Sequence, residues 1–154
     1  LLARAEEWLD LDALAAGRGS DATSGLRGLL GWRESARLDE VVPETITVPS
    51  GSRIRIDYPE PGSDTSPVLA VKLQECFGWA DGPTVCDGRV RVVLHLLSPA
   101  RRPLAVTDDL ASFWASVYPA VRVENRGRYS KHPWPEDPMT ATPTKRTNRA
   151  LRGN

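Results

Sequence analysis

The residues whose types suit catalysis or metal binding are few and scattered in this sequence. His95 and His132 are its two histidines, and Cys76 and Cys86 are its two cysteines. A multi-histidine metal site needs more ligands at closer spacing, so this set excludes one. Cys76 lies in an amphipathic segment and Cys86 just before a turn, and a secreted disulfide framework would use more cysteines. We therefore expect two free thiols and no bound metal.

The sequence also contains few residues or motifs that suit acid–base catalysis or nucleotide binding. Asp108 and Asp109 stand at an expected helix start. Adjacent carboxylates there point in different directions, and their negative charge interacts favourably with the helix dipole. His95 lies between leucines in an alternating segment, which favours a structural role. No phosphate loop, Gly-x-Gly-x-x-Gly, His-Glu-x-x-His or Gly-x-Ser-x-Gly motif occurs. The sequence thus predicts a chain that is not catalytic alone, with no catalytic residue, cofactor or metal of its own.

The residues best suited to a binding site lie toward the C-terminus. Between Arg126 and Pro138, three closely spaced prolines favour extended backbone, along which aromatic rings alternate with cations. In one interpretation the aromatic rings stack on bases while the cations contact phosphates. In the other, the rings pack into apolar surface pockets of the domain and so hold the tail against it. We take as candidate nucleic-acid-binding residues Arg126, Arg128, Tyr129, Lys131, Trp134, Lys145, Arg146 and Arg149, extended by Arg53 and Arg55.

Charge is unevenly divided, although 20 Lys and Arg balance 20 Asp and Glu over the whole chain. Residues 1–119 carry 12 cations and 17 acids, whereas residues 120–154 carry 8 cations and 3 acids. A basic segment favours an anionic partner such as RNA or single-stranded nucleic acid. The near-neutral total and the apolar start favour the alternative, a protein-docking domain. With no apolar run of about 20 residues and no signal peptide, we expect a cytoplasmic location without membrane contact.

The elements that position these residues follow from the hydrophobic period. Helical spacing and breakers predict three short helices, over Leu1–Leu14, Thr23–Leu30 and Arg33–Val41. Because the first begins at Leu1 within its helical pattern, we expect an upstream portion of the protein. Alternation then predicts a hairpin with strands Thr45–Val48 and Arg53–Tyr58.

Beyond the hairpin, the pattern predicts two further strands and two further helices. The expected elements are a helix over Pro67–Phe77, strands over Arg89–Leu97 and Leu104–Thr107, and a helix from Thr107 or Asp108 that Pro119 kinks. The order β-β-α-β-β-α predicts an α+β fold, a small and mainly antiparallel sheet with helices on one face. The expected parts are a helical segment over 1–42, an accessory domain over 43–125 and an extended Pro-rich, basic tail over 126–154.

Four sequence blocks resemble a known family in collinear order over about residues 40–140. They are Val48–Tyr58, Pro67–Gly78, His95–Leu104 and Gly127–Pro138, and the resemblance is to the C-terminal region of the bacterial HrpB family of DEAH-box ATP-dependent helicases, presumed to act on RNA. Ser130 departs from the family by standing where a proline is common.

The resemblance implies that catalysis lies elsewhere in the parent protein. ATP and Mg²⁺ would bind to RecA-like helicase domains upstream, which are also partners of this region, and no catalytic residue carries over. The implied function is a non-catalytic accessory domain that assists nucleic-acid engagement; the alternative is a domain that braces the helicase core or recruits a protein.

Overall fold

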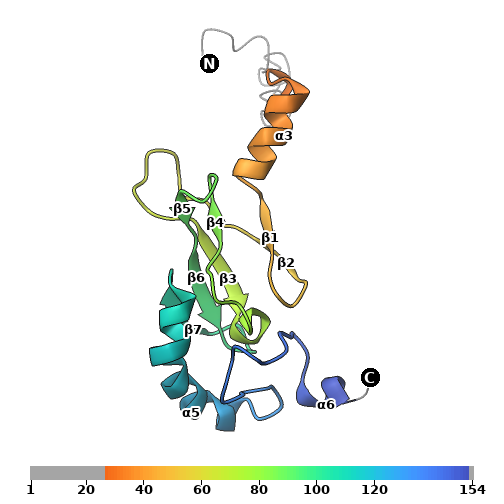
Figure 1. The fold of residues 1–154 in the computed structure, drawn as a ribbon, viewed down its shortest axis with the longest axis vertical. Coiled ribbons are helices and arrows are strands. Elements are labelled where there is room, and N and C mark those ends of the chain that lie inside the picture. The colour runs from red at the N-terminus through yellow and green to blue at the C-terminus, as the bar shows by residue number, and fades with distance from the viewer. Residues whose placement is uncertain (1–26, 153–154) are drawn as a thin grey trace, which may run out of the picture. The chain divides into compact units, whose positions relative to one another are not determined.

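The structure, a computed structural model, describes residues 27–152. The chain divides into two units, Leu1–Val42 and Pro43–Asn154. In the first unit the structure describes helix α3 (Trp32–Val41), close to the predicted Arg33–Val41 (Figure 1). The helix predicted over Leu1–Leu14, and most of that over Thr23–Leu30, lie outside the described residues. Every described helix falls short of the length and apolar character that crossing a bilayer requires.

The second unit begins with the predicted hairpin. Strands β1 (Thr45–Thr47) and β2 (Arg53–Arg55) are antiparallel, with Thr47 opposite Arg53. Gly51, with a φ of +83°, takes the left-handed conformation that the connecting turn requires. Alternation sends Ile46 and Ile54 against the core, which confirms the hairpin prediction.

The central sheet corrects one predicted element. The sequence predicts a helix over Pro67–Phe77, but Val68–Lys72 form strand β3 and only Leu73–Cys76 are helical, as a short 3-10 turn, η2. Leu69 and Val71 are buried while Ala70 between them is exposed, which is the two-residue period of a strand. A short apolar run fits both periods, and its valines favour the strand.

The sheet is mixed rather than mainly antiparallel. Its order is β3-β6-β7, where β6 (Val93–Leu97) is parallel to β3 and antiparallel to β7 (Pro103–Thr107). Between β3 and β6 the chain forms a second hairpin, β4 (Thr84–Val85) with β5 (Val90–Arg91). The strand predicted over Arg89–Leu97 is therefore divided between β5 and β6, and the strand predicted over Leu104–Thr107 is confirmed by β7.

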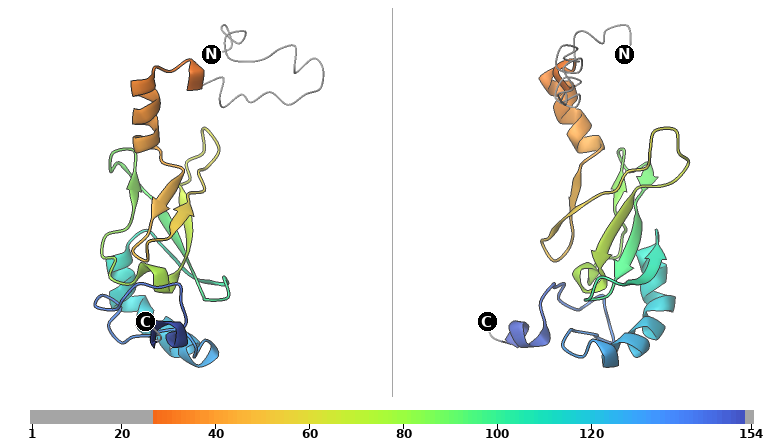
Figure 2. Two further views of the ribbon diagram at one scale, coloured as in Figure 1. Left: turned by 90° about the vertical axis from the view of Figure 1, so that its right-hand side faces the viewer. Right: turned by 180° about the vertical axis from the view of Figure 1, so that it is seen from behind.

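A continuous helical stretch follows β7 and packs on the sheet (Figure 2). It consists of α4 (Leu110–Ser112), the π-helical turn η3 (Phe113–Val117) and α5 (Tyr118–Arg128). Asp109 caps its start by accepting a hydrogen bond from the Ser112 N–H at 3.0 Å. The π turn ends two residues before Pro119, so the predicted irregularity is present as a widened turn within a continuing helix.

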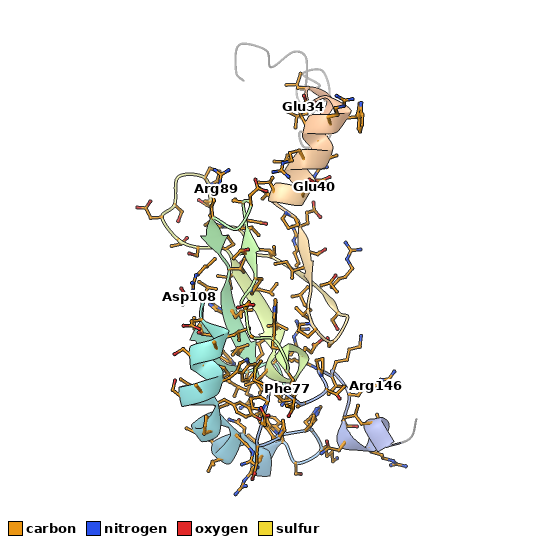
Figure 3. The ribbon with its side chains drawn as sticks, viewed as in Figure 1. Glu34, Glu40, Phe77, Arg89, Asp108 and Arg146 are labelled. Carbon is orange, nitrogen blue, oxygen red and sulfur yellow. The ribbon has the colours of Figure 1, made fainter. Side chains whose placement is uncertain are left out.

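The core lies between the sheet and this helical stretch. Leu94 and Leu96 of β6 are fully buried, as is Phe77, which Figure 3 shows beside the sheet. The ring of Trp114 lies 6.1 Å from that of Phe77 and 5.4 Å from that of Tyr118, between centroids. We call the opposite face of the sheet the open face: Val106 of β7 is 62% exposed there and Ala70 of β3 is exposed, while His95 between them is half-buried.

Candidate nucleic-acid interface

The first two candidate cations lie on helix α5 and not in an extended tail. The sequence predicts that the tail begins at Arg126, whereas α5 continues to Arg128. Tyr118, Val121 and Asn125 form its buried face, which leaves Arg126 and Arg128 exposed in the last turn. Cations at this end of a helix are stabilised by its dipole, so the helix continues three residues beyond the expected boundary.

The Pro-rich segment after α5 is fastened to the domain by hydrogen bonds. Tyr118 donates its hydroxyl to the Pro135 carbonyl at 2.8 Å, and Gly78 donates its N–H to the Pro138 carbonyl at 3.0 Å. Arg122 donates Nε–H to the Trp134 carbonyl at 2.9 Å. Burial raises the pKa of Tyr118 to about 12, so its phenol stays protonated and remains a donor at neutral pH.

The two candidate aromatic residues differ in how they are used. Trp134 packs against the core, and its Nε1–H donates to the Tyr129 carbonyl at 3.2 Å. Trp134 thus holds the segment against the domain, which is one of the two roles that the sequence leaves open for it. Tyr129 is half-buried, and its hydroxyl has no hydrogen-bond partner within residues 27–152. The Tyr129 ring is therefore the better placed of the two to stack on a base.

The basic C-terminal segment also returns to the body of the domain. Thr144 is buried and donates its N–H to the Gln74 carbonyl in η2 at 2.9 Å. Its hydroxyl accepts a hydrogen bond from the Arg146 N–H at 3.0 Å. Arg146 itself is exposed, at the end of the unit opposite Arg89 (Figure 3). Helix α6 (Asn148–Arg152) follows.

Two hydrogen bonds join α6 to the segment after α5. Asn148 donates its backbone N–H to the Lys131 carbonyl at 2.7 Å and its side-chain amide to the Ser130 carbonyl at 3.3 Å. A hollow of about 470 Å³ lies between the two segments, and its lining residues are Ser130, Lys131, Thr147, Asn148 and Arg149. Four of the six C-terminal candidate cations thus lie on α5 or next to these two bonds, and Lys131 and Arg149 share one hollow.

The remaining candidates, Arg53 and Arg55, are on another element. Both are exposed on β2, and Arg53 donates to the Thr45 hydroxyl at 3.0 Å across the hairpin. The turn of the hairpin contacts η2, where Ser50 donates its hydroxyl to a Glu75 carboxylate oxygen at 2.7 Å. No described contact joins Arg53 or Arg55 to the C-terminal cations.

Sequence reasoning missed three further exposed or half-buried cations at the end of the central sheet. Lys72 ends β3 opposite Leu97, and Arg101 and Arg102 lie in the tight β6–β7 turn, where Arg101 has a φ of +61°. Burial, and to a lesser extent the Lys72 cation, lower the pKa of His132 in the segment after α5. The pair Arg101-Arg102 was visible in the sequence, but the end of the sheet that it faces depends on the parallel β3–β6 pairing.

The cysteines, His95 and the neighbouring aspartates Asp108 and Asp109 lie in different parts of the described domain. Cys76 and Cys86 are free, and burial raises the pKa of the Cys76 thiol, so it stays protonated. A polar hollow of about 300 Å³ includes Asp81, Asp108 and Asp109, but no described group of three His, Cys, Asp or Glu has metal-binding geometry. His95 is half-buried within β6. Fold and surface together define a small α+β domain with a fastened, basic C-terminal segment.

Comparisons with known proteins give this domain its family. Residues 5–138 match the family described as ATP-dependent helicase C-terminal, HrpB_C. The ATP-dependent RNA helicase HrpB of Escherichia coli strain K12 is 48% identical over 97% of this chain and 19% of its own length. The chain therefore belongs to the family of C-terminal domains of HrpB-type ATP-dependent helicases.

Solved structures agree with that assignment. A crystal structure of the E. coli DExH-box NTPase HrpB has a TM-score of 0.85 and 49% identity over 96% of this chain and 18% of that one. A crystal structure of the E. coli DEAH/RHA helicase HrpB has a TM-score of 0.65 and 45% identity over 87% of this chain and 17% of that one. The chain thus spans about a fifth of the length of these relatives.

Proposed function

We propose that this chain is the non-catalytic C-terminal accessory domain of a cytoplasmic, ATP-dependent DEAH-box RNA helicase, and that it assists the helicase in engaging nucleic acid. The E. coli relative is named as an ATP-dependent RNA helicase, and this chain corresponds to 19% of its length. ATP and Mg²⁺ would bind in the other part of such a protein, where the catalytic motifs absent from this sequence would lie.

The observation that carries the proposal is a set of unpaired cations on a fastened segment. Six side chains are exposed and form no salt bridge with an acid among residues 27–152: Arg126, Arg128, Lys131, Lys145, Arg146 and Arg149. Arg122, by contrast, pairs with Glu136 at 3.2 Å. Unpaired cations on an ordered surface attract a phosphate backbone and release its counterions.

Binding to RNA at two salt concentrations tests this function. The 154-residue chain is mixed with a fluorescent single-stranded RNA at 50 mM and at 200 mM salt. Each phosphate contact with a single strand contributes about −0.7 to the slope of log affinity against log salt, so six contacts predict a loss of about 300-fold over this range. No detectable binding at 50 mM salt would contradict the proposal.

The open face of the central sheet favours a second function, docking onto the rest of the helicase. Val106 is 62% exposed there, opposite His95 in the register, and Ala70 of β3 is exposed on the other side of His95. An exposed apolar patch on a sheet face is typical of a surface that meets another protein domain.

A single substitution on this face tests docking. Val106→Glu would weaken binding of this chain to the remainder of the helicase supplied as a separate polypeptide. Val123→Glu is the matched control, because Val123 of α5 has the same exposed fraction, 62%. Equal binding by both variants would remove the sheet face from consideration.

A further inference from the structure

The hollow between the segment that follows α5 and helix α6 is lined by residues that each carry a polar or charged group. All five lining residues are polar or cationic: Ser130, Lys131, Thr147, Asn148 and Arg149. No acid and no apolar residue lines it. Lys131 and Arg149 are exposed and form no salt bridge with an acid within the described residues. The site therefore has two uncompensated positive charges and several hydrogen-bond donors.

The two walls of the hollow are held together, although they are far apart in the sequence. Asn148 donates two hydrogen bonds to the opposite wall. Its backbone N–H binds the Lys131 carbonyl oxygen at 2.7 Å, and its side-chain amide binds the Ser130 carbonyl oxygen at 3.3 Å. These bonds leave the Lys131 amine, the Arg149 guanidinium and the Thr147 hydroxyl free of described partners. The backbone positions from which the two cations extend are thus fixed before any ligand arrives, which lowers part of the ordering cost of binding.

An anion with several acceptor oxygens satisfies this combination of groups. Arg and Lys bind phosphate oxygens, and a nearby hydroxyl group can donate a further hydrogen bond to them. Nonspecific attraction by positive charge does not require such a hydroxyl. A volume of about 470 Å³ exceeds the size of one phosphate and leaves room for the sugars attached on either side. We propose that this hollow binds one phosphodiester group of a single-stranded RNA backbone between Lys131 and Arg149, with the Thr147 hydroxyl as an additional donor.

This assignment rests on the proposed function and makes it more specific. If one phosphate is shared by both cations, each single variant keeps one cation on it, and only the double variant lowers the magnitude of the salt slope by about 0.7. If each cation contacts its own phosphate, the double variant lowers the magnitude of the salt slope by about 1.4 instead. The double-mutant cycle therefore separates a shared site from two independent contacts.

The experiment measures RNA affinity of the full 154-residue chain from 50 to 200 mM salt for Lys131→Ala, Arg149→Ala and the double variant. The control is Arg89→Ala with Arg91→Ala, which removes the same charge from exposed residues around β5. Circular dichroism verifies that each variant is folded. The expected result is a slope whose magnitude falls by about 0.7 in the double variant and by less in either single variant, with no change in the control.

A charge-neutral variant gives an independent readout. Thr147→Val keeps the shape of the side chain and all charges but removes the hydroxyl, and we expect an affinity loss of about fivefold. Thr142→Val is its control, because Thr142 is exposed and its hydroxyl has no described hydrogen bond. A positive field alone would leave both variants with the affinity of the unchanged chain.

The outcomes separate this assignment from the broader function. RNA binding by the unchanged chain overturns the shared phosphate site, and leaves the function standing, if the double variant leaves the slope unchanged or lowers its magnitude by about 1.4. The assignment is also overturned if Thr147→Val binds RNA as well as Thr142→Val does. Absence of RNA binding by the unchanged chain overturns both.

Discussion

The backbone N–H of Asn148 lies 2.7 Å from the carbonyl oxygen of Lys131, and this hydrogen bond joins the basic C-terminal segment to the segment that follows α5. Since the two residues are 17 positions apart in the sequence, the bond closes a loop and returns Arg149 to the same hollow as Lys131. The surface on which the proposed function depends is thus created by tertiary contacts.

Asn148→Pro tests whether that bond organises the basic surface. Proline removes both the N–H and the side-chain amide, but it suits the first position of a helix. We expect weaker RNA binding at unchanged net charge, and faster amide hydrogen exchange at Thr147 and Arg149. Asn148→Ala is the control, because it keeps the backbone N–H. Equal RNA affinity for the two variants would show that the backbone bond is dispensable.

Trp134 is expected to contribute to stability more than to RNA contact. Its ring packs against the core, so Trp134→Ala should lower the free energy of unfolding by about 2 kcal/mol, less than a fully buried tryptophan because it is half-buried. Chemical denaturation measures the change. Trp32→Ala is the comparison, since Trp32 is 78% exposed and should change stability little. A Trp134→Ala variant that is as stable as Trp32→Ala would be inconsistent with fastening.

Tyr118 should make the stability of the domain depend on pH under alkaline conditions. Burial raises its folded-state pKa from 10.0 to about 12, so the folded state holds the proton more tightly than the unfolded state. This contribution is fully present below pH 10 and is lost as the pH rises toward 12. Tyr118→Phe cannot titrate, so its stability should fall less between these pH values. Parallel pH dependence of both proteins in urea denaturation would argue against the buried phenol.

Gln74 is expected to destabilise the domain through its side chain. Both amide atoms of this side chain are buried and have no hydrogen-bond partner, although its backbone carbonyl accepts from Thr144. Gln74→Met has a similar shape without the unsatisfied groups, and we expect the free energy of unfolding to rise by about 1 kcal/mol. Thermal and chemical denaturation measure this, and a loss of stability would indicate that the amide makes a compensating interaction.

The local elements of this fold could be predicted where one hydrophobic period was clear. Alternation in Arg53–Tyr58 and the helical face from Leu110 to Val121 predicted a strand and a helix at the right places. The run Val68–Val71 fitted both periods, and its strand character is set by parallel pairing with β6, a non-local contact. The sequence therefore indicated the α+β class but not the mixed order of the central sheet.

The candidate site was predictable in residue type but not in arrangement. The excess of cations over acids and the spaced prolines indicate the C-terminal region, and the sequence leaves Trp134 two roles, packing on the domain or stacking on a base. Its packing became clear only with the core in place. The proximity of Lys131 to Arg149 depends on the Asn148 bond, and that of Thr144 to Gln74 on a contact across about half of the chain. Periodicity carries no information about such contacts.

RNA-stimulated ATP hydrolysis by the full-length helicase tests the central claim most directly. The six exposed C-terminal cations are replaced by alanine together, and the RNA concentration that gives half-maximal stimulation is compared with that of the unchanged protein. We predict that this concentration rises steeply at physiological salt, while ATP hydrolysis at saturating RNA and the KM for ATP stay the same. An unchanged RNA dependence would contradict a role in nucleic-acid engagement and would favour docking through the open face of the sheet.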